Sequence, residues 1–211
     1  MDNLGMIADD IRSELDLKNS AREQALKLSR EIIRNSANAI RAIHRDEFDD
    51  AKQLIGEARK KVIETKELLQ EHLDIYYTGY VQDAQKEHAE SILTMAIVLN
   101  DRLPSHQEIG VECAPYLNGL GEAVGECRRR VLDIIRLGEY ERGEQILQVM
   151  DEAYYTLVTF DYPDAITGGL RRTTDMVRGI LERTRGDLTV TIRQQELEQA
   201  INTAIGHLTN G

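Results

Sequence analysis

The sequence predicts an all-α protein, and three observations carry that prediction. Apolar residues recur every three or four positions along almost the whole chain, which is the period of an amphipathic helix. Only 5% of the residues are aromatic, Trp is absent, and there are three Pro, whereas strand-rich folds use more aromatic and turn residues. At 211 residues, the chain is long enough for one domain, residues 1–211, with a sizeable core.

The periodicity predicts seven helices, with a first helix of about ten turns. The boundaries follow from caps, Pro and Gly. A loop is expected from Asp101 to Ala114, and a break or bend at Gly168 and Gly169. The expected helices cover residues 4–43, a segment from an N-cap at Asp46 to Glu71, then 76–99, 115–137, 140–160 and 164–185, and a final C-terminal helix after Gly186 over 188–209.

The first helix would be about 60 Å long at 1.5 Å per residue, which exceeds the diameter of a globule of 24.0 kDa. We therefore expect part of its apolar face to pack on other subunits of a homo-oligomer. The last helix places an apolar face on one side, and it would either cap the bundle or serve the oligomer interface; that face consists of Leu197, Ile201, Ile205 and Leu208.

The amino-acid composition limits the partners and the cellular location that we expect for the protein. The chain has 26 Lys and Arg and 37 Asp and Glu, which gives a net charge of −11. Its overall electrostatic field therefore does not attract a polyanion. A nucleic-acid partner would need a local basic patch or metal ions. We expect no membrane partner, since there is no run of about 18 apolar residues. The first residues do not resemble a signal peptide, and the two cysteines, Cys113 and Cys127, are too few for a disulfide scaffold, so we expect a cytoplasmic protein with free thiols.

Two acidic pairs are candidate metal ligands. Glu87 and Glu90 lie three residues apart, and Glu122 and Glu126 lie four apart, so each pair falls on one face of a helix. Four carboxylates from two facing helices would suit Mg²⁺ or Mn²⁺. The alternative is that these pairs belong to solvated helix faces, because such spacings are common in a chain with 37 acidic residues. A di-iron site is excluded, since no His follows a Glu by three positions.

Glycines surround the second acidic pair. Each of them is disfavoured inside a helix by about 1 kcal/mol relative to Ala. Their presence is reasonable where another backbone, a metal or a ligand approaches closely. These glycines are Gly119, Gly121 and Gly125.

The main basic cluster, Arg128–Arg129–Arg130, follows the second acidic pair directly. Arg129 and Arg130 come three and four residues after Glu126, so acid and base share a helical face suited to a phosphodiester. An interhelical array of salt bridges is the alternative. Weaker clusters are Arg171, Arg172 and Arg178 and the first-helix series Arg30, Arg34, Arg41 and Arg45. The candidate nucleic-acid contacts are Arg128, Arg129, Arg130, Lys86, Arg30 and Arg34.

Four segments resemble the translin family, and within it the branch of translin-associated factor X (Trax), particularly the archaeal Trax-like proteins. They are residues 27–32 (KLSREI) with the following Ser36, Ile40 and 43–45, then 80–90 (YVQDAQKEHAE), 115–126 (PYLNGLGEAVGE) and 183–188 (RTRGDL). The similarity covers about residues 10–190 in order. Each motif is moderately specific, and their order and spacing carry the resemblance.

The resemblance implies a seven-helix subunit that assembles into a hollow homo-octamer around single-stranded RNA or DNA. Trax subunits are Mg²⁺-dependent endoribonucleases, whereas translin subunits bind nucleic acid without the acidic set. Glu87 and Glu90 match the first catalytic pair and Glu126 the later glutamate, while Glu122 stands where the family usually has Asp. Because the sequence has acidic residues at all four positions, the resemblance favours the Trax branch over translin.

The sequence therefore predicts a metal-dependent endoribonuclease that hydrolyses single-stranded RNA, and binds single-stranded DNA as a further expectation. Glu87, Glu90, Glu122 and Glu126 would hold one or two Mg²⁺ and perform the catalysis, and arginines would position the strand. Two other classes stay open: a translin-like binding protein without turnover, and a helical scaffold for another protein.

Overall fold

The computed structural model describes residues 3–209, and every regular element in that range is a helix, which confirms the all-α class. The long N-terminal helix is also confirmed. Six helices have 19 residues or more, and three have four residues. The elements are α1 (Leu4–His44), α2 (Phe48–Leu68), α3 (Leu73–Tyr76), α4 (Gly79–Leu99), α5 (His106–Ile109), α6 (Cys113–Ile135), α7 (Tyr140–Val158), α8 (Asp164–Thr167) and α9 (Leu170–Thr209).

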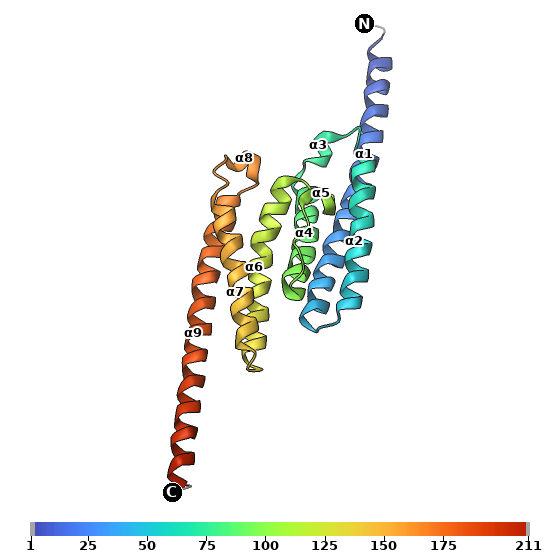
Figure 1. Cartoon of the computed structure of the whole chain (residues 1–211). Helices are drawn as coiled ribbons and strands as arrows, with labels where there is room; N and C mark the ends of the chain where they lie inside the picture. The colour runs from blue at the N-terminus through green and yellow to red at the C-terminus, as the bar shows by residue number, and fades with distance from the viewer. Residues whose placement is uncertain (1–2, 210–211) are drawn as a thin grey trace.

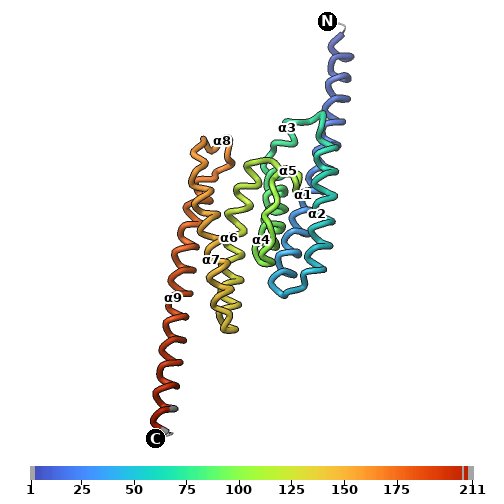
Figure 2. Tube along the Cα trace, viewed as in Figure 1, coloured from blue at the N-terminus to red at the C-terminus, as the bar shows by residue number. Residues whose placement is uncertain are grey.

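The long helices lie side by side in one extended array (Figures 1 and 2). α2 packs on α1, α1 on α4, and α4 on α6, while α6 also contacts α7 and α9. α6 is therefore central and joins the N-terminal and C-terminal halves. Its buried stripe includes Val124, Cys127 and Val131, and this stripe belongs to the main core cluster together with Ile32 of α1 and Leu93 of α4.

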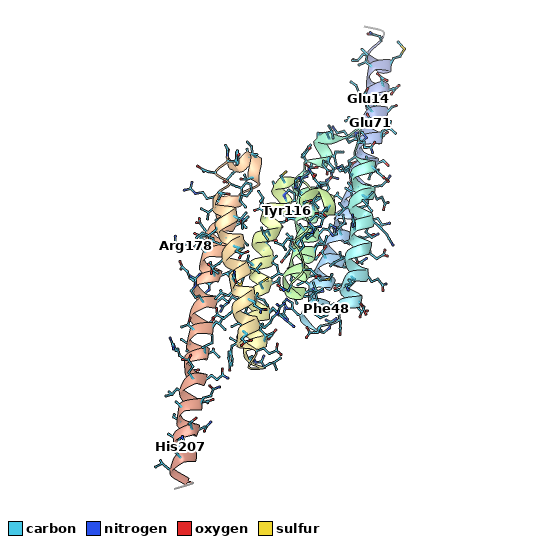
Figure 3. The ribbon with its side chains drawn as sticks, viewed as in Figure 1. Glu14, Phe48, Glu71, Tyr116, Arg178 and His207 are labelled. Atoms are coloured by element: carbon cyan, nitrogen blue, oxygen red, sulfur yellow. The ribbon has the colours of Figure 1, made fainter. Side chains whose placement is uncertain are left out.

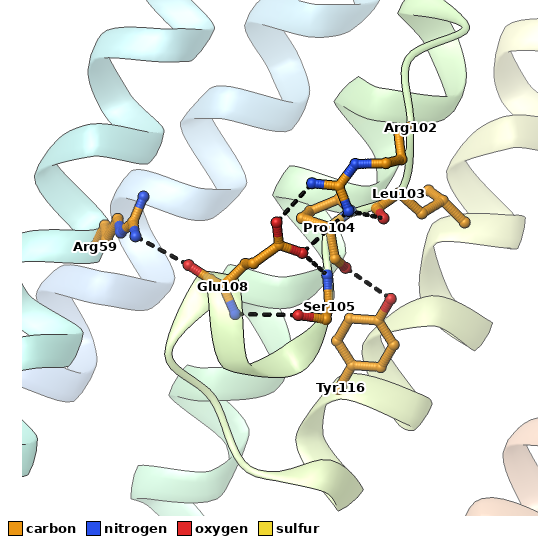
Figure 4. Close-up of polar contacts among 7 residues, drawn as sticks. All are labelled: Arg59, Arg102, Leu103, Pro104, Ser105, Glu108 and Tyr116. Carbon is orange, nitrogen blue, oxygen red and sulfur yellow. Dashed lines mark hydrogen bonds and ion pairs between the residues drawn. The ribbon is translucent and has the colours of Figure 1, made fainter.

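The expected loop from Asp101 to Ala114 contains the one-turn helix α5, which a capping box stabilises (Figure 4). The Ser105 hydroxyl accepts from the Glu108 backbone N–H, and the Glu108 carboxylate accepts from the Ser105 N–H and from Arg102. These bonds lower the pKa of Glu108 to about 2, with the Arg102 hydrogen bond as the largest cause. Arg59 of α2 and Tyr116 of α6 donate to backbone carbonyls of this segment, so the loop is tied to both helices.

Three boundary predictions were wrong. Asp46 is not the N-cap of the second helix, because it adopts a left-handed conformation with φ of 60° and the helix begins after Glu47. The helix predicted from Tyr76 begins only at Gly79, as α4, and Tyr76 instead ends the separate short helix α3. The two segments predicted around Gly186 form one continuous helix, α9, so the number of helices differs from seven in the described range.

The predicted break at Gly168 and Gly169 is confirmed. Both glycines have positive φ, at 63° and 83°, a conformation that costs residues other than Gly about 1 kcal/mol or more. They end α8 and start α9 in a new direction.

The N-terminal part of α1 and the C-terminal part of α9 project from the array at opposite ends (Figure 1), where Figure 3 labels Glu14 and His207. Both projecting parts carry exposed apolar side chains. Among the described helices, none combines the length and the apolar character that a membrane crossing requires. The exposed apolar residues of these parts include Leu4, Met6, Ile7, Ile11, Leu15 and Leu17 on α1, and Val190, Leu197, Ile201, Ile205 and Leu208 on α9.

A candidate metal centre between α4 and α6

Gly119 allows α6 to approach the backbone of α4 very closely. A Cβ at this position would lie 2.8 Å from the Lys86 carbonyl oxygen and 2.9 Å from the Ala89 Cβ. The closest approach therefore falls on the turn of α4 that carries the first acidic pair. Gly121 instead faces α9, where a Cβ would overlap the Thr173 methyl, and Gly125 has only an ordinary contact to Ile180.

This approach brings three carboxylates together. One carboxylate oxygen each from Glu87, Glu90 and Glu122 lies within 4.8 Å of the other two. Glu90 is buried, with 8% of its surface exposed, whereas Glu87 and Glu122 are half-buried. The sequence prediction that residues of both acidic pairs face each other across two helices holds for these three side chains.

The grouping raises the pKa of two of the carboxyls. Burial is the largest cause for Glu90, and repulsion from Glu87 and Glu122 adds to it, so its pKa rises to about 8. Burial and the Glu122 charge also raise the pKa of Glu87. Buried carboxylates that repel one another are stabilised by a cation, and an all-oxygen ligand set suits Mg²⁺ or Mn²⁺. The donor set fits such an ion.

The Lys86 ammonium supplies a cation to this cluster within the chain itself. Its Nζ donates to Glu122 Oε1 at 2.8 Å and lies 3.9 Å from Glu87 Oε1. Burial lowers the pKa of Lys86, but the hydrogen bond and charge of Glu122 outweigh it, so the net pKa is raised. Lys86 therefore balances part of the negative charge of the cluster.

Glu126 does not belong to the group of three. Its Oε2 is 2.5 Å from Nε2 of His44, the last residue of α1. This hydrogen bond is the largest cause that lowers the pKa of Glu126, and the charge of Arg129 contributes to the same effect. His44 was not singled out as a site residue from the sequence, where it stood only within the family-like stretch 43–45. No local spacing links two residues 82 positions apart.

The three consecutive arginines have three different environments, because neighbours on a helix point about 100° apart. Arg128 contacts α9, where it donates to Thr184 and Asp187. Arg130 pairs with Asp46 in the turn before α2. Arg129 is exposed, one turn beyond Glu126. Arg30 and Arg34 are exposed on α1.

Solved structures resemble this chain over nearly their whole length. The structure of a complex of AfC3PO with duplex RNA matches with a TM-score of 0.83 and 30% identity, and the match covers 89% of this chain and 97% of that chain. The chain belongs to the translin/C3PO family. A crystal structure of AfC3PO gives a TM-score of 0.81 at 30% identity over the same shares of the two chains.

Two further relatives extend the translin/C3PO comparison. Apo-NeC3PO shares the fold, with a TM-score of 0.79, 20% identity and coverage of 87% of this chain and 96% of that chain. An uncharacterized protein, MJ0175 of Methanocaldococcus jannaschii, is 34% identical over 184 residues, which are 86% of this chain and 81% of the relative. No family model matches the chain.

Proposed function

We propose that the protein is a Mg²⁺-dependent endoribonuclease that cleaves single-stranded RNA at the carboxylates between α4 and α6. The observation that carries the proposal is the grouping of Glu87, Glu90 and Glu122, with oxygen atoms within 4.8 Å of one another. A cluster of partly buried acids is costly for stability, and strongly perturbed carboxyls in one place favour a functional role.

The chain's own residues would prepare the site. With a pKa of about 8, Glu90 carries a proton near pH 7 in the metal-free protein and releases it before its oxygen atoms hold a cation. Glu126, oriented by His44, adds negative charge at the edge of the site. When bound, a divalent cation would neutralise charge that develops on the phosphodiester. Lys86 would pair with a phosphate oxygen.

RNA binding is proposed from the translin/C3PO relationship and from exposed cations. AfC3PO was solved with duplex RNA, so an RNA ligand is in line with the family; the preference for single strands, and binding of single-stranded DNA, remain part of our proposal. Among the six candidate cations, Arg129, Arg30 and Arg34 are exposed. Arg128, Arg130 and Lys86 already pair with acidic side chains, so they would bind a strand only in exchange for those partners.

We also propose a hollow homo-octamer. The apolar faces on the projecting parts of α1 and α9 would be buried between subunits, since burial of apolar surface yields about 25 cal/mol per Å². A hollow shell would let an acidic protein concentrate its arginines inside. The exposed free thiol of Cys113 fits a reducing compartment, which agrees with the expected cytoplasmic location.

The experiment is cleavage of an end-labelled single-stranded RNA with Mg²⁺ and with EDTA. The wild type, Glu90→Gln and Glu126→Ala are compared with Glu64→Gln, which changes an exposed acid on α2. We expect the wild type and Glu64→Gln to cut only with Mg²⁺, and both site variants to lose at least 100-fold in rate while they retain RNA binding. Equal rates for all four proteins would refute the assignment.

The Lys86–Glu122 ion pair favours one alternative, a binding protein without turnover. An ammonium that already balances the acidic cluster removes part of the need for a metal. RNA binding by the wild type with no cleavage at any Mg²⁺ concentration would select this alternative.

A further inference from the structure

A cavity of about 670 Å³ lies beside the carboxylates, where the starts of α4, α6 and α9 meet. Lys86 and Glu122 belong to its wall as well as to the candidate metal centre. A ligand group in the cavity would therefore be adjacent to the carboxylates. The volume falls within the range of about 300–1,000 Å³ that is typical of small-ligand sites.

The lining of the cavity includes two apolar side chains that are well exposed. Tyr77 and Ile166 line it with 60% and 66% of their surfaces exposed. The Tyr77 ring is held by an edge contact with Tyr76, at 5.1 Å between centroids and 84° between planes. Tyr76 is itself buried and donates to Glu112. The chain thus keeps an aromatic ring exposed beside the cavity on a fixed support.

The charged residues of the lining carry both signs: Arg172 and Lys86 are cations, whereas Asp83, Glu112 and Glu122 are acidic. Arg172, in the first turns of α9, lines the cavity and is exposed. Within residues 3–209 its guanidinium has no ion-pair partner, unlike Arg128 and Arg130. Lys86 adds a second positive charge towards the carboxylates. An anionic group in the cavity would bind at Arg172, because Lys86 already pairs with Glu122.

Hydrogen bonds tie part of the cavity lining to the packed helices. Asn118 donates to the Thr167 carbonyl at 2.8 Å and accepts from the Thr173 hydroxyl at 2.6 Å, and all three residues are buried or half-buried. These bonds fix the α8–α9 corner against α6. The cavity is therefore part of the packed structure and does not depend on a loose surface loop.

We propose that this cavity receives one unpaired nucleotide of the RNA strand, next to the phosphodiester that is cut. Its base would lie against Tyr77 and Ile166, and its phosphate would bind Arg172. Bases of single strands are commonly stacked on aromatic side chains, whereas a paired base would first have to leave its stack. The inference rests on the proposed function, because it uses the same RNA and the same carboxylates, and it gives a structural reason for single-strand preference.

Cys113 provides a test that does not need cleavage. It is exposed and lines the cavity, whereas Cys127 is fully buried and its thiol pKa is raised to about 12 by burial. A maleimide will therefore modify Cys113 and leave Cys127 as an internal reference. The full chain is treated in EDTA with and without a saturating single-stranded RNA, and modification is followed by mass spectrometry. Binding is measured separately by fluorescence anisotropy.

We expect saturating RNA to slow Cys113 modification at least tenfold, and an abasic strand of equal length to give no protection. Tyr77→Ala and Arg172→Gln should each weaken RNA binding about fivefold or more. Arg136→Gln is the control, since Arg136 is an exposed arginine that pairs with Asp133 and does not line this cavity.

The outcomes separate this inference from the nuclease. If RNA protects Cys113 but is not cleaved, the nucleotide cavity is supported and the proposed endoribonuclease activity is refuted. If RNA is cleaved or binds to saturation while the rate of Cys113 modification stays unchanged, the nucleotide cavity is refuted but the nuclease is not. Equal protection of Cys113 by the abasic strand would also refute the nucleotide cavity alone. Absence of RNA binding overturns both proposals.

Discussion

His44 Nε2 lies 2.5 Å from Glu126 Oε2, and this contact joins the end of α1 to the middle of α6. His44 is buried, whereas Glu126 is half-buried. The bond holds Glu126 apart from the other three acidic side chains and keeps its pKa low. The four acidic positions thus divide into three that group together beside Lys86 and a fourth that bonds to His44, although the charge of Glu126 still adds to the raised pKa values of Glu87 and Glu90.

The His44–Glu126 contact should contribute to stability. We expect His44→Phe and Glu126→Gln each to destabilise the fold, and their double-mutant cycle to give a coupling of about 1.5–3 kcal/mol, as for hydrogen bonds to charged groups. The measurement is urea unfolding of the four proteins without metal. A coupling near zero would mean that the contact does not stabilise the folded chain.

Glu90 should make stability depend on pH. Its pKa is raised from 4.5 to about 8 in the folded chain, so the folded state binds its proton more tightly than the unfolded state does. That contribution to stability is present at low pH and is lost as the pH rises towards 8. We expect the metal-free wild type to lose more stability between pH 5 and 8 than Glu90→Gln. Parallel pH profiles of the melting temperature would contradict the environment described for Glu90.

Gly119 and Gly125 offer a matched comparison on one helix. Gly119→Ala should cost about 1–3 kcal/mol, because the new methyl meets α4 backbone at 2.8 Å, and it should also move apart the helices that carry the carboxylates. Gly125→Ala meets only a methyl of Ile180 at 3.7 Å, so we expect it to stabilise the helix by up to about 1 kcal/mol. Chemical denaturation gives both values, and equal effects would argue against a close α4–α6 contact.

Arg129 should bind the RNA backbone without a role in stability. It is exposed, so Arg129→Gln should leave the melting temperature unchanged and weaken RNA binding. The slope of log affinity against log salt should fall by about 0.7 for each phosphate that the variant no longer neutralises. Lys66→Gln, on the exposed surface of α2, is the control. An unchanged slope would remove Arg129 from the interface.

Helical periodicity was sufficient to predict the class and the places of the long helices, but local signals misplaced some boundaries and divided α9 into two predicted helices. Gly186 was predicted to end a helix, yet α9 continues through it. One Gly inside a helix lowers its stability by only about 1 kcal/mol relative to Ala. The four-residue helices are too short to show a period. For α5, the Ser105–Glu108 capping box was a signal in the sequence that went unused.

The site was predictable in part. Spacing placed each acidic pair on one helix face, but it could not show that Gly119 sets the contact that unites Glu87, Glu90 and Glu122. Nor could it show that Glu126 bonds to His44. Both features arise from packing between helices that are distant in sequence. For the basic cluster the sequence left two interpretations open, a shared face for a phosphodiester and an interhelical array of salt bridges; Arg128 and Arg130 form separate ion pairs, as the second predicts.

The central claim is that Glu87, Glu90 and Glu122 form a divalent-cation site, and Mn²⁺ binding tests it without any choice of RNA. Mn²⁺ is titrated by calorimetry into the wild type, Glu90→Gln and the exposed-site control Glu64→Gln at pH 8. We predict one class of site in the wild type and the control, with at least tenfold weaker binding in Glu90→Gln. Equal affinity in all three proteins, or no binding in any, would contradict the claim.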